Sequence, residues 1–377
     1  MLKGSVVGNR GILNRLTGAL LPLALLLTIL PARSDTPSPS PVSGAARPGA
    51  RVVVDAHNCY PYEGRWADRI DRALAAATPI AIEQDLVARQ DKSTGAAEPV
   101  LSHSRAPSAG DPAFARYFFE ALRPRIEAAL AADDRSSWPL VTLNLDLKSD
   151  QPATLHAIWN VLEKYQDWLT TAPRTADLAA VQPLDVGPIL VLTGASDAQQ
   201  AVFYNQVPVG GKLLVFGAVH DHVQPAGGVP APDPANNYRR WWNNSWSTIE
   251  PGGPWQAGTW TPRKAGRLQT MVQRAHQAGL WIRFYTLDGA SEAEMRCHGW
   301  MPHYDFGSLA AAEVRWRAAA AAGVDYIASD QYAELAAVLA GQPVPAASDG
   351  QAVGSCRNFS VADAARLDLY RWLGVQR

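Results

Sequence analysis

Short apolar runs recur along the chain from residue 52 onward, and segments with apolar residues at helical spacing lie between them. The runs have the length and the Val, Ile and Leu content of buried β-strands, whereas the intervening segments have the periodicity of amphipathic helices. The runs predict strands over residues 52–56, 79–82, 140–147, 187–192, 212–219, 280–287 and 324–328. Residues 241–247, which contain no Val, Ile or Leu, predict a further, weak strand. The intervening pattern predicts helices over residues 65–77, 111–132, 153–169, 198–204, 265–277, 309–322, 332–339 and 361–373.

Eight predicted strands therefore alternate with helices between residues 51 and 341. This rhythm is typical of a single-domain parallel (β/α)8 barrel, the TIM-barrel architecture of the α/β class, because each parallel strand needs a crossover helix to return the chain. Reacting groups in such barrels lie at the carboxyl ends of the strands. Polar residues at those ends are the first candidates for chemistry.

The two ends of the chain have a different composition. Basic residues precede an apolar stretch over residues 16–30, and Ala32 and Ser34 offer small residues at a cleavage site, so residues 1–34 indicate a signal peptide of an exported protein. An uncleaved anchor is the alternative, although the stretch is shorter than the roughly 20 residues that span a bilayer. Residues 35–50 are rich in Pro, Ser and Ala and predict a disordered linker, and residues 342–377 predict an extension that packs on the barrel.

The charge balance bears on the class of binding partner, and the cysteine content bears on disulfide bonding. The chain has 34 basic and 35 acidic residues, so it lacks the strong positive charge of a nucleic-acid binder, and we expect no nucleic-acid partner. Three cysteines are an odd number for an exported protein. Cys297 and Cys356 can pair, although connectivity does not follow from sequence, and Cys59 would then be a buried free thiol.

Histidines and acids gather after the first two predicted strands. The first strand ends in His57-Asn58, the second ends in Glu83-Gln84-Asp85, and an extended piece over residues 98–101 leads to His103. Because side chains alternate along a strand, Glu83 and Asp85 point to the same side. A divalent cation held by such carboxylates and flanked by two imidazoles can cleave a phosphodiester.

The predicted strand over residues 140–147 carries polar residues on one face and leucines on the other. The polar positions are Asn144, Asp146 and, directly after the strand, Lys148. Burying such groups without partners costs several kcal/mol each, so they need a metal, a ligand or one another. The alternative to a ligand site is a polar layer satisfied internally, for example by an Asp146–Lys148 pair.

Taken in order, His57-Asn58, Glu83-x-Asp85, His103 and Asp146-x-Lys148 resemble the motifs of the PI-PLC-like phosphodiesterase superfamily. This superfamily includes glycerophosphodiester phosphodiesterases, phosphoinositide-specific phospholipases C and sphingomyelinase D. The start His57-Asn58-Cys59-Tyr60 looks most like the branch related to fungal altered inheritance of mitochondria protein 6. The stretch GVDYIASD over residues 323–330 is similar to the closing strand of glycerophosphodiesterases.

The resemblance implies a role for each matching position. One divalent cation, Mg²⁺ or Ca²⁺, would be bound by Glu83, Asp85 and Asp146, with Asn58 as a further oxygen ligand. His57 and His103 would be the catalytic acid and base, and Lys148 would neutralise phosphate charge. The third acid is Asp where the phospholipases and many glycerophosphodiesterases have Glu, which is closer to sphingomyelinase D and leaves the identity of the metal open.

The activity that we expect is metal-dependent hydrolysis of a phosphoric diester, either a phospholipid or a glycerophosphodiester-like molecule. A phosphodiester is anionic, so a cation must offset the charge that builds on its oxygens, while histidines move protons near neutral pH. Arg283 and Tyr285, two residues apart on the seventh strand, are expected to reach the lumen and contact the phosphate. His220, at the end of the fifth strand, is a further candidate for substrate contact.

Two other functions remain open from the sequence. His220-Asp221-His222 has the spacing of a metal-binding HxH pair, as in amidohydrolase barrels, and a transition metal would favour that function over the carboxylate site. A catalytically silent barrel that binds a ligand is the other alternative.

Tryptophans also gather over residues 241–260, which we expect to include a loop at the barrel mouth: Trp241, Trp242, Trp246, Trp255 and Trp260. They predict contact with a headgroup or with a membrane surface, or else ordinary packing over the barrel rim.

Overall fold

The computed structural model describes residues 44–61, 67–90, 95–222, 228–298 and 302–345. Within these residues, eight parallel strands close into a barrel in the order β1-β13-β12-β11-β8-β6-β4-β2, and β2 returns to β1. Their bounds are β1 Val53–Ala56, β2 Ile80–Gln90, β4 Val141–Leu147, β6 Ile189–Thr193, β8 Phe216–Ala218, β11 Arg239–Ser245, β12 Trp281–Tyr285 and β13 Tyr326–Ser329. The predicted (β/α)8 TIM barrel is confirmed.

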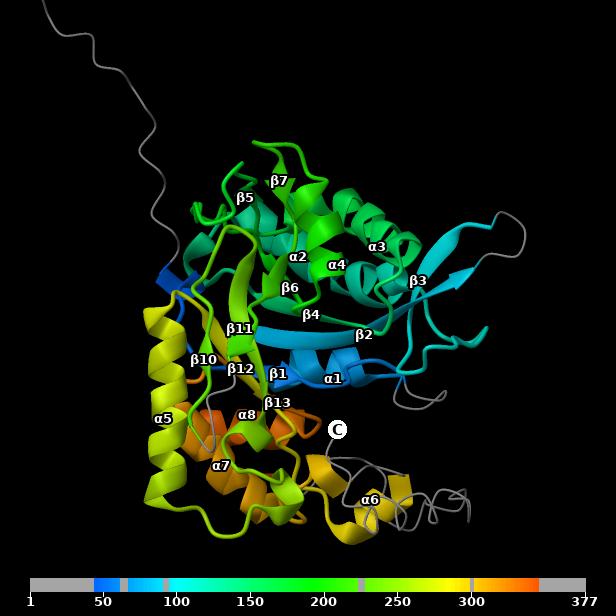
Figure 1. Ribbon diagram of the computed structural model, residues 1–377. Helices are drawn as coiled ribbons and strands as arrows, with labels where there is room; N and C mark the ends of the chain where they lie inside the picture. Colours follow the sequence, from blue (N-terminus) through cyan, green and yellow to red (C-terminus); the bar gives the residue numbers. More distant parts are fainter. Residues whose placement is uncertain (1–43, 62–66, 91–94, 223–227, 299–301, 346–377) are drawn as a thin grey trace, which may run out of the picture. The chain divides into compact units, whose positions relative to one another are not determined.

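Helices surround these strands (Figure 1). Their bounds are α1 Arg69–Ala76, α2 Ala121–Ala132, α3 Pro152–Lys164, α4 Asp197–Gln200, α5 Pro262–Gln277, α6 Glu292–His298, α7 Leu309–Ala322 and α8 Tyr332–Leu339. Every residue of β1, β6 and β13 is buried, which is why these strands appear in the sequence as short continuous apolar runs. The barrel and its helices enclose one large apolar core.

Several predicted elements differ from those observed, among them the following strand and helix. The strand predicted over residues 212–219 is split: β7 Lys212–Leu213 pairs antiparallel with β5 Ala172–Pro173, and only β8 enters the barrel. The helix predicted over residues 111–132 begins as a π-helical segment, Ala115–Glu120, before α2. Pro124 in α2 lacks the N–H that an α-helical hydrogen bond to Glu120 would need, so the irregular turn lies next to the position where regular bonding is interrupted.

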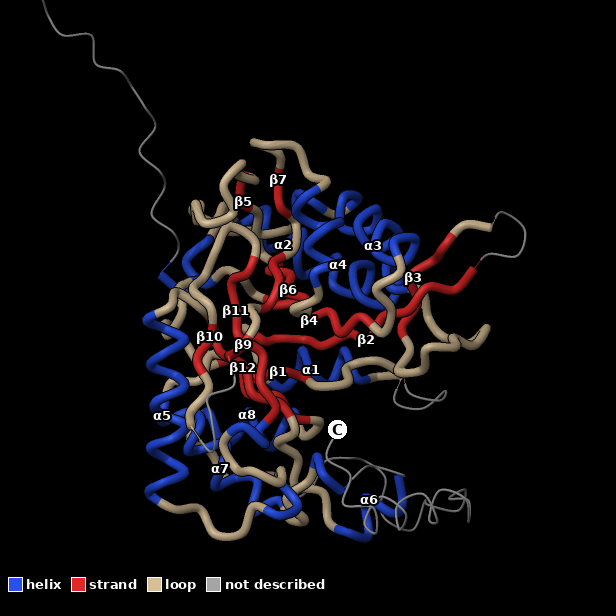
Figure 2. The backbone as a smooth tube through the Cα atoms, viewed as in Figure 1, coloured by secondary structure: helices blue, strands red, loops and turns tan. Residues whose placement is uncertain are grey.

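Strand β2 continues past the barrel and pairs antiparallel with β3 Ala97–Leu101. The two strands lie side by side away from the other barrel strands (Figures 1 and 2). The extended piece before His103 is therefore the second strand of a hairpin rather than a barrel strand. The backbone N–H of Ser102 donates to the carbonyl of Asp85 at 3.0 Å, which returns the chain to the barrel mouth.

The predicted linker over residues 35–50 ends earlier than expected. Residues Gly44–Ala46 form a 3-10 turn, and Ala46 is buried against Trp138 and Val186. The predicted signal peptide, the helix at 361–373 and most of the extension over 342–377 lie outside the described residues. Cys356 and the side chain of Cys297 lie outside them too, so their pairing stays a prediction. No helix among the described residues is long and apolar enough to cross a membrane.

Candidate active site

A cavity of about 480 Å³ opens at the carboxyl ends of the barrel strands. It collects polar side chains that are far apart in sequence, because parallel strands bring their carboxyl ends to one rim. Residues predicted from the sequence that line it are His57, Asn58, Glu83, His103, Asp146, Lys148, Arg283 and Tyr285.

Three of the predicted acids form one oxygen cluster. Glu83, Asp85 and Asp146 each place a carboxylate oxygen within 4.8 Å of the others. Register explains this, because β2 and β4 are neighbours and Asp85 lies directly opposite Asp146. Glu83 and Asp85 are buried, whereas the Asp146 side chain is 49 % exposed. Carboxylate oxygens are the donors that Mg²⁺ and Ca²⁺ prefer, so this group can hold such an ion.

Lys148 lies against the same cluster. Its Nζ is 2.8 Å from Asp85 Oδ2 and 2.7 Å from Asp146 Oδ2. Burial raises the pKa of Asp85 to about 7, more than the nearby ammonium offsets, and the two carboxylates raise the pKa of Lys148 against the effect of its own burial. The Asp146–Lys148 pair considered from the sequence is present, so part of the polar layer is satisfied internally.

Glu83 joins the oxygen cluster to the histidine side of the cavity. Its Oε2 accepts from the backbone N–H of Asn58 at 3.1 Å and lies 3.3 Å from His57 Nε2, while Oε1 lies 3.2 Å from Arg283 Nη2. Burial alone would raise the pKa of Glu83, but His57 and Arg283 outweigh it and lower the pKa. Glu83 is therefore ionised and can act as a ligand.

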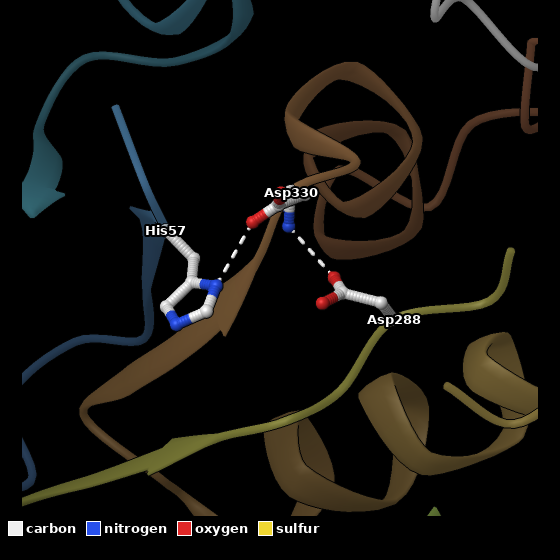
Figure 3. A group of neighbouring side chains, drawn as sticks. All are labelled: His57, Asp288 and Asp330. Atoms are coloured by element: carbon white, nitrogen blue, oxygen red, sulfur yellow. Dashed lines mark hydrogen bonds and ion pairs between the residues drawn. The ribbon is translucent and has the colours of Figure 1, made fainter. Parts of the chain in front are cut away.

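His57 is held from its other ring nitrogen by Asp330, which follows β13. Nδ1 lies 2.8 Å from Asp330 Oδ1 (Figure 3). Burial lowers the pKa of His57, yet the carboxylates of Glu83 and Asp330 outweigh it and raise the pKa to about 10. Burial likewise raises the pKa of Asp330, but Arg69 and His57 bring it down to about 2. The pair is therefore built to stabilise an imidazolium.

Asn58 has a left-handed backbone with φ 49°. This conformation, which Asn tolerates better than most residues, turns the chain so that its N–H reaches Glu83. The side-chain Nδ2 lies 3.1 Å from Asp330 Oδ1, and Oδ1 accepts from the Tyr60 hydroxyl at 3.2 Å. Its amide therefore supports the His57 side of the cavity, and its role as a metal ligand stays a prediction.

His103 is exposed at the rim of the cavity that contains His57. Partial removal from water and the charge of Lys148 lower its pKa. The hairpin of β2 and β3 therefore brings the second predicted histidine to the same cavity as the first.

The three predicted substrate contacts differ in position. The Arg283 side chain is only 2 % exposed and bonds to Asp55, which lies on β1; its Nη1 also donates to Asn243 Oδ1 at 3.1 Å. Tyr285 stacks on His57, with ring centroids 6.5 Å apart. His220 is exposed, lies 3.2 Å from Asp197, and is not among the described residues that line the cavity.

The HxH pair is not part of a metal cluster in the described chain. His222 pairs with Asp233 rather than sharing a partner with His220. The groups of His, Cys, Asp and Glu that are close enough to hold an ion in the described residues are Glu83, Asp85 and Asp146, and His57, Asp288 and Asp330.

The tryptophan segment over residues 241–260 has two parts: strand β11, and after it the expected loop, which contains two short 3-10 turns, Trp246–Thr248 and Pro254–Gln256. Trp241 and Trp242 belong to β11, which begins two residues before its predicted start, and both are buried, as is Trp246. Trp255 is 37 % exposed. The alternative of ordinary packing therefore describes Trp242 and Trp246, whereas Trp241, although buried, lines the cavity.

Several acids of the site were missed in the sequence. Asp330 follows β13 and Asp288 follows β12, and both line the cavity together with Asp305. The rule that selected His57 and Glu83, a polar residue at the carboxyl end of a strand, also applies to Asp288 and Asp330. Arg69 at the start of α1 carried no such signal, because only the folded chain brings its Nη2 to 3.2 Å from Asp330 Oδ2.

Comparisons with known proteins give two structural likenesses. No family model matches the chain, and no curated protein matches it. A glycerophosphoryl diester phosphodiesterase from Parabacteroides distasonis aligns at 15 % identity over 79 % of this chain and 90 % of its own, with a TM-score of 0.34. Plasmodium falciparum HPPK-DHPS with pterin and p-hydrobenzoate aligns at 8 % identity over 86 % of this chain and 52 % of its own, with a TM-score of 0.35. Likenesses this loose carry no argument about activity.

Proposed function

We propose that this chain is a phosphoric diester hydrolase of the PI-PLC-like superfamily that uses one divalent cation held by Glu83, Asp85 and Asp146. The observation that carries the proposal is the cluster of these three carboxylates, two of which, Glu83 and Asp146, line the same cavity as His57 and His103, while Asp85 is buried beside them. His57 lies 3.3 Å from Glu83 and is held by Asp330 at its far nitrogen. The likeness to the branch of altered inheritance of mitochondria protein 6 rests on residues 57–60 alone.

The chemistry follows from what each side chain can do. When bound, the cation offsets the negative charge that builds on the non-bridging oxygens of the phosphate. Lys148 adds a positive charge beside Asp146. His57, whose positive charge Asp330 stabilises, donates a proton to the departing alkoxide, and His103, whose pKa is lowered, accepts one from water or from a substrate hydroxyl.

The substrate that fits this proposal is a small-molecule or lipid phosphodiester. A cavity of about 480 Å³ lies in the range of pockets for small ligands and headgroups. Export through residues 1–34 would place the activity outside the cytoplasm. Trp255, which is 37 % exposed, would be a residue for contact with a membrane.

Hydrolysis of bis-p-nitrophenyl phosphate tests the proposal, followed by a panel of natural diesters. We expect His57→Ala and His103→Ala to abolish turnover while circular dichroism still shows the fold of the parent; His57→Ala should in addition lower the melting temperature, because it removes a buried partner of Glu83 and Asp330. His156→Ala is the matched control, because His156 is exposed on α3, bonds to Gln206 and should not affect turnover. Full activity in either active-site variant would refute the assignment, and no cleavage of any diester by the parent would favour a ligand-binding barrel.

A further inference from the structure

Asp288 is a buried acid that the proposed chemistry does not use. It follows β12, and its Oδ1 accepts a hydrogen bond from the Ser329 hydroxyl at 2.7 Å. The same oxygen accepts from the backbone N–H of Asp330 at 2.7 Å (Figure 3). Both donors belong to the carboxyl end of β13. The carboxylate of Asp288 therefore fixes the backbone from which Asp330 reaches His57.

The backbone of Asp288 is itself fixed. Its N–H donates to the carbonyl of Tyr304 at 3.2 Å, and its carbonyl accepts from Phe306 at 2.8 Å. The next residue, Gly289, donates its N–H to Gln331 Oε1 at 2.7 Å, a second link to the segment after β13. Asp288 thus lies in a loop whose backbone is held by hydrogen bonds, so its carboxylate can hold the backbone of Asp330 in place.

We propose that Asp288 is a positioning residue for the catalytic histidine: it holds the end of β13 so that the Asp330 carboxylate stays aligned with His57 Nδ1. The inference rests on the proposed function, in which His57 transfers a proton. In this role Asp288 acts on His57 through Asp330 and not by binding substrate or metal itself. Besides His57, the Asp330 carboxylate also contacts Asn58 and Arg69, so a small displacement of its backbone changes the orientation of the imidazole.

Kinetics of Asp288→Ala, which removes the acceptor, and Asp288→Asn, which keeps an acceptor oxygen, test this role. Because a misplacement of about 1 Å can cost about 100-fold, we expect Asp288→Ala to lower kcat about 10- to 100-fold with little change in KM, and Asp288→Asn to retain most of the parent kcat. If Asp288 acts through Asp330, the double variant Asp288→Ala/Asp330→Ala loses no more than Asp330→Ala alone.

Asp325→Ala is the matched control. Asp325 is also buried and also accepts two backbone N–H groups, from Gly49 at 2.7 Å and Ile282 at 2.9 Å, but it lies just before the other end of β13. We expect it to lower the free energy of unfolding without lowering kcat. Ser329→Ala, which removes only one donor, gives a milder test if Asp288→Ala does not fold.

Hydrogen exchange of the Asp330 amide separates this inference from the proposed function. The amide should exchange faster in Asp288→Ala than in the parent, and at an unchanged rate in Asp325→Ala, whether or not the protein cleaves a diester. Two results for Asp288→Ala would overturn the positioning role: an Asp330 amide that exchanges as in the parent, or a kcat equal to that of the parent. The role would also be overturned if Asp288→Asn lowered kcat as much as Asp288→Ala, or if the double variant had a lower kcat than Asp330→Ala alone. A parent without turnover would instead refute the proposed function.

Discussion

Replacing Arg283 by Met separates a structural from a substrate-binding role for this side chain. Its guanidinium lies between two carboxylates, with Nε bonded to Asp55 and Nη2 3.2 Å from Glu83 Oε1. All three residues are buried. Arg283→Met removes the positive charge and leaves the volume nearly filled. Asp55 and Glu83 then lack the guanidinium as a counterion in the barrel interior.

The cost follows from burial. Removing one partner of a buried ion pair destabilises a protein by about 3–5 kcal/mol, because the remaining charge has lost both water and its counterion. For a domain of this size that corresponds to a fall in melting temperature of about 10 °C. The variant Asp55→Asn/Arg283→Met should be more stable than Arg283→Met, since Asp55 no longer contributes an uncompensated charge.

Urea unfolding gives the free energy of unfolding of Arg283→Met, and steady-state kinetics on the same samples give its KM and kcat. We expect Arg283→Met to lose stability and, through a displaced Glu83, cation affinity. A variant whose unfolding free energy stays within about 1 kcal/mol of the parent while KM for the diester rises would show instead that Arg283 contacts the phosphate, as the sequence predicted.

Three further predictions follow. Asp330 has a folded pKa of about 2, below its ordinary value near 4, so its contribution to stability is present above pH about 4 and lost as the pH falls toward 2; the unfolding free energies of the parent and Asp330→Asn should converge by about 2 kcal/mol over that window, measured by urea titration. Lys148→Met should bind Ca²⁺ more tightly in calorimetry, because the ammonium that competes for Asp85 is gone, and an unchanged affinity would contradict this competition. Phe118→Ala, at a fully buried ring, should cost about 3–5 kcal/mol in unfolding free energy without changing the KM of folded protein, and a cost below about 1 kcal/mol would contradict its place in the core.

The sequence predicted the barrel because strands buried on both faces remain visible as short apolar runs. It also predicted that His57, Glu83, Asp85 and Asp146 lie close together. That prediction needs only the alternation of side chains along a strand and the position of each residue at the carboxyl end of its strand, and both can be read from a short stretch of sequence. The boundaries were less accurate where long-range pairing decides them, as in β2, which extends to Gln90 because β3 pairs with its end.

The rest of the site depends on contacts between distant segments. Asp330 lies 273 residues from His57 in the sequence, and no local pattern indicates that the two residues pair. Arg283 points into the lumen as expected, but Asp55 on the neighbouring side of the barrel binds its guanidinium. The sequence predicted a strand for Trp241 and Trp242 but not their burial, because large aromatic residues beside Asn occur in buried strands and in exposed loops alike.

Turnover of bis-p-nitrophenyl phosphate by metal-depleted protein, with Mg²⁺ or Ca²⁺ added back, tests the central claim most directly. The account predicts no hydrolysis after chelation, recovery as one ion binds, and no recovery in Asp85→Asn, whose carboxylate lies in the oxygen cluster. Hydrolysis that persists in excess chelator, or recovery in Asp85→Asn equal to that of the parent, would contradict a cation held by Glu83, Asp85 and Asp146.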